Sequence, residues 1–137
     1  MSICLTQIDV TKLQTIRALV VDEDKVYQSL LCKLLKTHGI EVVGKASSLN
    51  EAVLVYQAAR PDVVLIDLNC EGETRIAALS KFKELDPPAK VIALSVLNYF
   101  EDDTRGRSGV VDAYITKGSA AREIVDTVRR VVIGKVS

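Results

Sequence analysis

Short runs of apolar, β-rich residues alternate with segments of helical periodicity along most of this chain. A continuous apolar run that ends in polar residues is typical of a strand buried on both faces of a sheet. Five runs of this kind predict strands, at residues 18–21, 41–46, 62–67, 91–94 and 112–115.

Between the strands, apolar residues recur at intervals of three and four positions, which predicts amphipathic helices. The first helix carries Val26, Leu30, Leu31, Leu34 and Leu35. It ends near Gly39, and His38 at its end has a structural role in this interpretation, because a cation suits the carboxyl end of a helix. The second helix begins at a capping box formed by Ser48 and Glu51, and it stops at Pro61.

The second half of the chain contains two further helical patterns. One spans residues 76–85 and is terminated by Pro87-Pro88, and the other is capped by Ser119. The apolar face of this last helix consists of Ile124, Val128, Val131 and Val132. Two glycines weaken a helix over residues 98–109. Strands and helices thus alternate, which predicts an α/β fold with a doubly wound, five-stranded parallel sheet.

Length, charge and cysteine content narrow the function classes. The 137 residues fit one domain, and 18 basic against 18 acidic residues argue against a nucleic-acid binder. No apolar run is long enough to span a membrane, and the N-terminus lacks the features of a signal peptide. Cys4, Cys32 and Cys70 fit no metal motif and are expected to be reduced thiols. We therefore expect a cytoplasmic protein, with residues 1–15 as an N-terminal extension.

Polar side chains follow the apolar strands at the points where the strands end. Residues 22–24 (Asp-Glu-Asp) follow the first strand, Asp67 ends the third, Ser95 ends the fourth, and Lys117 follows the fifth. In parallel sheets, ligands bind outside these carboxyl ends. A cluster of oxygen ligands without histidine suits a hard cation such as Mg²⁺, or Mn²⁺. An ammonium and a hydroxyl beside such a site suggest phosphoryl chemistry, in which a carboxylate can be the nucleophile.

These segments resemble the receiver domain of bacterial response regulators, the phosphorylated partner in two-component signalling. The resemblance covers about residues 16–134, and it is carried by four matching pieces in the right order, Val20–Glu23, Pro61–Asn69, Val91–Ser95 and Ala113–Lys117. It implies a flavodoxin-like (βα)5 sandwich, similar to the chemotaxis regulator, with strand order 2-1-3-4-5. The receiver domain would occupy residues 16–137.

The resemblance also implies a role for each polar residue at the strand ends. Asp67 would be the phosphoacceptor, Lys117 would contact the phosphate, Ser95 would be the switch hydroxyl, and Tyr114 would be the rotating aromatic. The ligands of Mg²⁺ or Mn²⁺ would be Asp22, Glu23, Asp67 and the backbone carbonyl of Asn69. A sensor histidine kinase or a phosphotransfer protein in a phosphorelay would supply the phosphoryl group, so the chain would be a signalling domain and not an enzyme.

Two departures from the family pattern lie near this site. The loop at residues 70–75 lacks the usual proline and carries extra acids, and Val96 stands where the family usually has a small residue. Neither departure removes a residue that the chemistry requires.

Two alternative functions stay open at this point. Residues 22–26 fit the D-x-D-x-[TV] pattern of haloacid-dehalogenase-type phosphohydrolases, in which Asp22 would be the nucleophile, but Asp67 and Asn69 are then unexplained. The other alternative is a receiver-like interaction module that is never phosphorylated. The expected partners include a second copy of the chain, bound through residues 98–134, but neither nucleic acid nor membrane. The sequence does not separate a stand-alone regulator from a fragment of a transcription factor.

Overall fold

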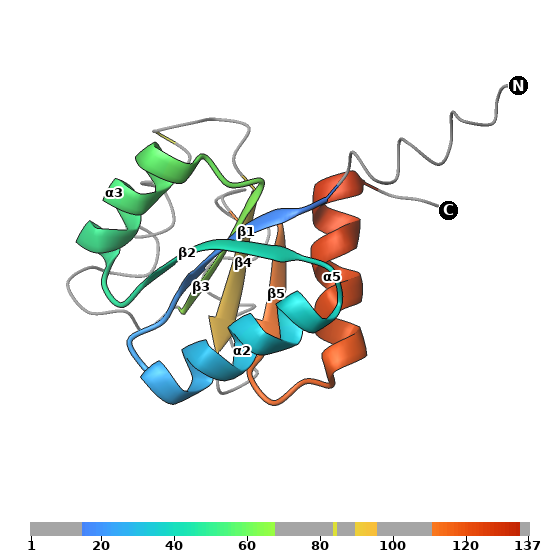
Figure 1. Ribbon diagram of the computed structural model, residues 1–137. Coiled ribbons are helices and arrows are strands. Elements are labelled where there is room, and N and C mark those ends of the chain that lie inside the picture. The colour runs from blue at the N-terminus through green and yellow to red at the C-terminus, as the bar shows by residue number, and fades with distance from the viewer. Residues whose placement is uncertain (1–14, 68–83, 85–89, 96–110, 135–137) are drawn as a thin grey trace, which may run out of the picture.

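The computed structural model describes residues 15–67, 84, 90–95 and 111–134 (Figure 1). Within them, five parallel strands form one sheet in the order β2-β1-β3-β4-β5. The strands are β1 (Arg17–Val21), β2 (Glu41–Ala46), β3 (Val63–Asp67), β4 (Lys90–Ser95) and β5 (Ala113–Thr116). The predicted fold class and strand order are confirmed, and each strand boundary lies within one residue of its prediction.

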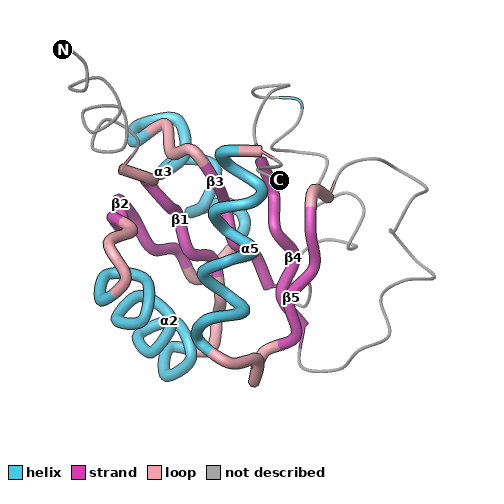
Figure 2. The backbone as a smooth tube through the Cα atoms, turned by 90° about the vertical axis from the view of Figure 1, so that its right-hand side faces the viewer, coloured by secondary structure: helices cyan, strands magenta, loops and turns pink. Residues whose placement is uncertain are grey.

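Helices cover both faces of the sheet. Helix α3 (Leu49–Ala59) packs on one face, and α2 (Lys25–Thr37) and α5 (Ala121–Ile133) pack side by side on the other (Figure 2). Successive side chains of a strand point to opposite faces. In β3, for example, Val64 belongs to the core beneath α3, and Leu65 belongs to the core beneath α2 and α5. Burial on both faces therefore explains the continuous apolar runs.

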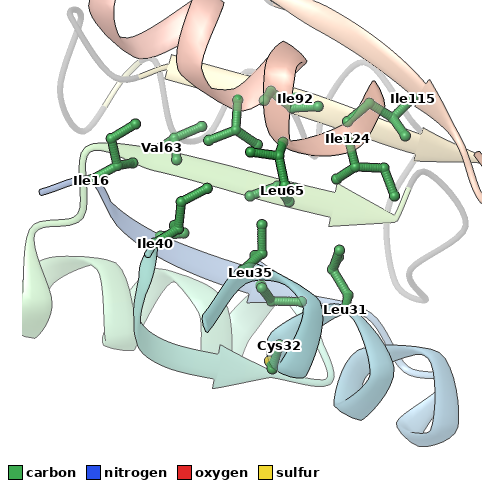
Figure 3. Packing of buried hydrophobic residues seen from close by; sticks show 14 of the residues in the cluster. Ile16, Leu31, Cys32, Leu35, Ile40, Val63, Leu65, Ile92, Ile115 and Ile124 are labelled. Carbon is green, nitrogen blue, oxygen red and sulfur yellow. The ribbon is translucent and has the colours of Figure 1, made fainter. Parts of the chain in front are cut away.

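Figure 3 shows the core beneath α2 and α5, which is the larger of the two among the described residues. Its fully or nearly fully buried side chains include Leu31, Leu35, Leu65, Ile92 and Ile124. Val26 and Leu30 are not part of it, although their spacing assigns them to the apolar positions of α2. They are 78% and 60% exposed, so the buried face of this helix is narrower than its apolar pattern predicts.

The N-termini of α3 and α5 differ in their capping. The predicted cap of α3 is confirmed, because the Ser48 hydroxyl accepts a hydrogen bond from the Glu51 backbone N–H at 3.2 Å. The predicted cap of α5 is wrong. This helix begins after Ala120 without a side-chain cap, and the Ser119 hydroxyl instead donates to the carbonyl of Thr116 at 2.7 Å.

Strand β2 contains an irregularity opposite β1. Ala18 pairs with Val42 but Leu19 pairs with Gly44, so Val43 is an extra residue in the ladder, as in a β-bulge. Gly44 faces α3 at close range, because a Cβ atom built there would lie 2.5 Å from Cγ1 of Val55. The glycine therefore lets the helix approach the strand.

Arg17 fastens the start of β1 to the turn between α3 and β3. Its guanidinium donates hydrogen bonds to the carbonyls of Arg60 and Ala59 at 2.7 and 2.8 Å. Its backbone N–H donates to the Asp62 carboxylate at 2.9 Å, and its carbonyl accepts from the Asp62 N–H at 2.8 Å. Arg60 has a φ of 48°, a left-handed conformation that is unusual for a residue with a side chain, and these bonds hold it.

Three predictions fall outside the described residues. They are the helix at residues 76–85 apart from Glu84, the helix at residues 98–109, and the extension at residues 1–15 apart from Thr15.

Candidate functional site

Four of the predicted site residues lie at the carboxyl edge of the sheet. Asp22 directly follows β1, Asp67 and Ser95 are the last residues of β3 and β4, and Lys117 directly follows β5. Asp67 is paired with Leu94 in the ladder, so Ser95 lies one position beyond it on the neighbouring strand. Asp22, Asp67 and Ser95 are all at most 5% exposed. Such burial is rare for carboxylates, so the two aspartates indicate a functional site.

Lys117 joins the two buried carboxylates. Its Nζ atom lies 2.6 Å from Oδ2 of Asp22 and 3.4 Å from Oδ2 of Asp67. The two acids are 45 residues apart in sequence, and Lys117 is a further 50 residues from Asp67, so only the parallel topology brings them together. These three groups carry a combined charge of −1 when all are ionised.

Burial and charge pairing shift the pKa values of Asp22 and Lys117. Desolvation raises the pKa of the Asp22 carboxyl, and contacts with Lys117 and the Asp24 N–H offset that effect only in part. For Lys117, desolvation acts to lower the pKa, but attraction to Asp22 and Asp67 outweighs it, and the pKa of the ammonium is raised. Lys117 thus stays charged, and it serves two carboxylates at once.

The backbone around Asp22 is fixed by hydrogen bonds. Oδ1 of Asp22 accepts from the Asp24 N–H at 2.8 Å, and the Asp24 side chain in turn caps α2 by accepting from the N–H groups of Val26 and Tyr27. The buried Gln28 donates Nε2 to the carbonyls of Asp22 and Ala46 at 3.1 and 2.9 Å. The sequence analysis did not identify Gln28. The available signal was an amide about one helical turn after the acidic residues that follow the first strand.

Ser95 and Lys117 are also connected directly. The Lys117 backbone N–H donates to the Ser95 carbonyl at 2.6 Å, so the ends of β4 and β5 hold these two residues together. Tyr114 pairs with Ala93 on β4 and is partly buried against the core beneath α3. It therefore lies on the opposite face of the sheet from α5.

Tyr27 is a second residue that sequence reasoning missed. The Lys117 ammonium lies over its ring, with Nζ 4.8 Å from the ring centroid, which is within the range of a cation–π interaction. The hydroxyl of Tyr27 is buried and has no hydrogen-bond partner among the described residues. Burial raises the pKa of this phenol, so the hydroxyl remains protonated at neutral pH.

Two further predicted metal ligands are Glu23 and Asn69. Glu23 follows Asp22 in sequence but its side chain is exposed. Asn69, the loop at residues 70–75 and Val96 lie outside the described residues.

The described part of the cluster fits a hard divalent cation. Oδ2 of Asp22 is buried and accepts no hydrogen bond of regular geometry from the described residues, although the ammonium of Lys117 is close to it. Oxygen donors with excess negative charge are the ligands that Mg²⁺ prefers. Asp22 and Asp67 are two such donors, whereas the described residues contain no group of three or more His, Cys, Asp or Glu arranged to hold a metal.

Comparisons with known proteins agree with this geometry. Residues 18–129 match the family described as response regulator receiver domain. The response regulator protein VraR of Staphylococcus aureus is 32% identical over 122 residues, which cover 88% of this chain. The chain spans only 58% of the length of that relative.

Solved structures show the same fold. A two-component response regulator of the LuxR family from Aurantimonas superposes with a TM-score of 0.81 at 24% identity, covering 89% of this chain and 88% of the other. The response regulator TrrA of Thermotoga maritima, solved in complex with Mg²⁺ and BeF, gives a TM-score of 0.76 at 24% identity, over 85% and 98% of the two chains. Among the described residues of the present chain, no helix is both long and apolar enough to cross a bilayer.

Proposed function

This chain belongs to the response regulator receiver domain family, and from that premise we propose that it is a switch controlled by phosphorylation of Asp67. A receiver domain is a signalling domain and not an enzyme. The observation that carries the proposal is Lys117, whose ammonium contacts both Asp22 and Asp67 at the carboxyl edge of the sheet.

In the proposed reaction, a carboxylate oxygen of Asp67 attacks the phosphorus atom of a donor. An O–P bond forms as the P–N bond of a phosphohistidine, or the P–O bond of acetyl phosphate, breaks. The leaving group departs with the bonding electron pair as imidazole, which takes up a proton, or as acetate. Lys117 is placed to neutralise charge on the transferred group, because its ammonium is already 3.4 Å from Asp67.

Asp22 and Asp67 would hold Mg²⁺, or Mn²⁺, together with Glu23 and the backbone carbonyl of Asn69. When bound, the cation would offset the negative charge of the carboxylates and of the phosphoryl oxygens. Asp22 is anchored at two groups, because the Asp24 N–H donates to its carboxylate and Gln28 donates to its carbonyl.

The signal would leave the site through the ends of β4 and β5. Phosphorylation adds negative charge and acceptor oxygens beside Ser95 and Lys117. The Ser95 hydroxyl would move toward the phosphate, and Tyr114 would turn in response. Residues 98–134 would then form the surface that a partner or a second copy of the chain reads.

The proposed phosphodonor is a sensor histidine kinase or a phosphotransfer protein in a phosphorelay. We keep the division into an extension at residues 1–15 and a receiver domain at residues 16–137, and a cytoplasmic location, which is typical of response regulators. Family membership leaves the haloacid dehalogenase alternative without support. A receiver-like module that is never phosphorylated is the remaining competitor.

Phosphorylation from a small donor separates these two functions. The protein is incubated with acetyl phosphate and Mg²⁺, and its intact mass is measured. One phosphoryl group adds about 80 Da, and Asp67→Asn should abolish the addition because the nucleophile is gone. Asp62→Asn, at the exposed position just before β3, is the matched control and should label normally. A wild-type chain that takes no label from acetyl phosphate or phosphoramidate, or an Asp67→Asn variant that labels fully, would contradict the proposal.

A further inference from the structure

Tyr27 packs against Lys117, the residue that contacts both Asp22 and Asp67. Its ring lies beneath the Lys117 ammonium, and the exposed fraction of the Lys117 side chain is only 11%. A second feature is the buried hydroxyl, which makes no hydrogen bond to any described residue. Among the described residues, it is therefore the ring of Tyr27, and not its hydroxyl, that contacts the site.

The position of the ring is built into the start of α2. The Asp24 carboxylate accepts hydrogen bonds from the N–H groups of Val26 and Tyr27 at 3.0 and 3.2 Å, which fixes the first turn of the helix. The Asp24 N–H also donates to Asp22, so the turn that places Tyr27 is tied to a carboxylate that pairs with Lys117. Tyr27 also packs against the core beneath α2 and α5. The ring is therefore held by this core and by the first turn of α2.

We propose that Tyr27 is a positioning residue, whose ring holds the Lys117 ammonium between Asp22 and Asp67 and keeps water from that side of it. The proposal rests on the proposed function, because the orientation of Lys117 matters most when a phosphoryl group reaches Asp67. A cation held over an aromatic ring cannot swing toward solvent without losing the attraction of the ring face. The ring thus limits the directions in which Lys117 can leave the site.

Two substitutions distinguish the role of the ring from that of the hydroxyl. Tyr27→Phe keeps the ring face and removes the hydroxyl, and Tyr27→Leu removes both. We expect Tyr27→Phe to label from acetyl phosphate at the wild-type rate and to be at least as stable. Tyr27→Leu should label about fivefold more slowly, the equivalent of roughly 1 kcal/mol of cation–π attraction. Leu34→Ala controls for lost packing, because Leu34 lies on the same helix against the same core but away from the site.

A second measurement tests the contact without any phosphorylation. Protons on the carbon next to the Lys117 nitrogen should resonate upfield because of the ring current, in the wild type and in Tyr27→Phe but not in Tyr27→Leu. Absence of that shift in the wild-type protein would overturn the proposal. So would a Tyr27→Leu variant that labels as fast as the wild type, or one slowed no more than Leu34→Ala. A wild-type chain that takes no label at all would instead overturn the proposed function and, with it, the role of Tyr27 in it, even with the shift present.

Discussion

Replacing Lys117 with methionine should reveal how strongly the two buried carboxylates repel each other. Methionine preserves most of the side-chain length but removes the charge. In the native chain both Oδ2 atoms lie on the same ammonium, at 2.6 and 3.4 Å, so they are at most about 6 Å apart. At an effective dielectric constant of about 20, two unit charges at that separation repel by about 3 kcal/mol. Removing one partner of a buried ion pair costs a similar amount, about 3–5 kcal/mol.

We therefore expect Lys117→Met to lose about 3 kcal/mol of unfolding free energy at pH 7.5 while keeping its fold. The loss should depend on pH. Without the ammonium, the pKa of one carboxyl in the folded state rises further above its ordinary value of 3.8, and the unfolded state does not share this rise. The folded variant then binds a proton more readily than the unfolded chain does, so its stability increases as pH falls through the raised pKa of the folded state. The deficit relative to wild type should shrink between pH 7.5 and pH 5.

Urea unfolding followed by circular dichroism, in buffer with a chelator, measures both quantities. Lys33→Met is the matched control, because Lys33 is an exposed lysine on α2, and its effect should stay within about 0.5 kcal/mol. A Lys117→Met deficit below about 1 kcal/mol at pH 7.5 would refute the reasoning. An equal deficit at the two pH values would show that lost packing, and not charge, is responsible.

Two other predictions concern packing. Gly44→Ala should lower the free energy of unfolding in urea by about 1–3 kcal/mol, because the new Cβ would lie 2.5 Å from Val55. The loss should be smaller in a Val55→Ala background. Equal losses in both backgrounds would disprove the clash. Cys32 is buried, and burial raises the pKa of its thiol. Iodoacetamide at pH 7.5 should therefore alkylate it at least about tenfold more slowly in the folded chain than in urea, as measured by peptide mapping. Equal rates would contradict its burial.

The sequence predicts the sheet and the site together, because one physical cause underlies both. Strands buried on both faces read as apolar runs, and the polar residue that ends each run marks the carboxyl edge. Asp22, Asp67, Ser95 and Lys117 are found by this rule alone. Glu23 obeys the same rule but its side chain is exposed, because it lies in the turn after β1, where the rule does not fix which way a side chain faces.

The sequence does not predict contacts between side chains of different elements. Tyr27 meets Lys117 across 90 positions, and no periodicity records that pairing. Local chemistry can also be misread, because Ser119 has the composition of a helix cap but bonds back to the strand end at Thr116. Val26 and Leu30 match helical spacing yet lie on the solvent side, because spacing fixes a face but not its width.

The bonds made by Arg17 bear on the order in which the chain folds. They join segments 42 to 45 residues apart, and they close β1, α2, β2 and α3 into a loop that ends at β3. Such a closure is entropically costly to form and, once formed, lets the enclosed segment gain its contacts together. We expect residues 17–66 to form one cooperative unit, whose amides open to hydrogen exchange together. Lys117, from a strand beyond that unit, completes the charged cluster only when β5 docks, so the site would be assembled at the end of folding.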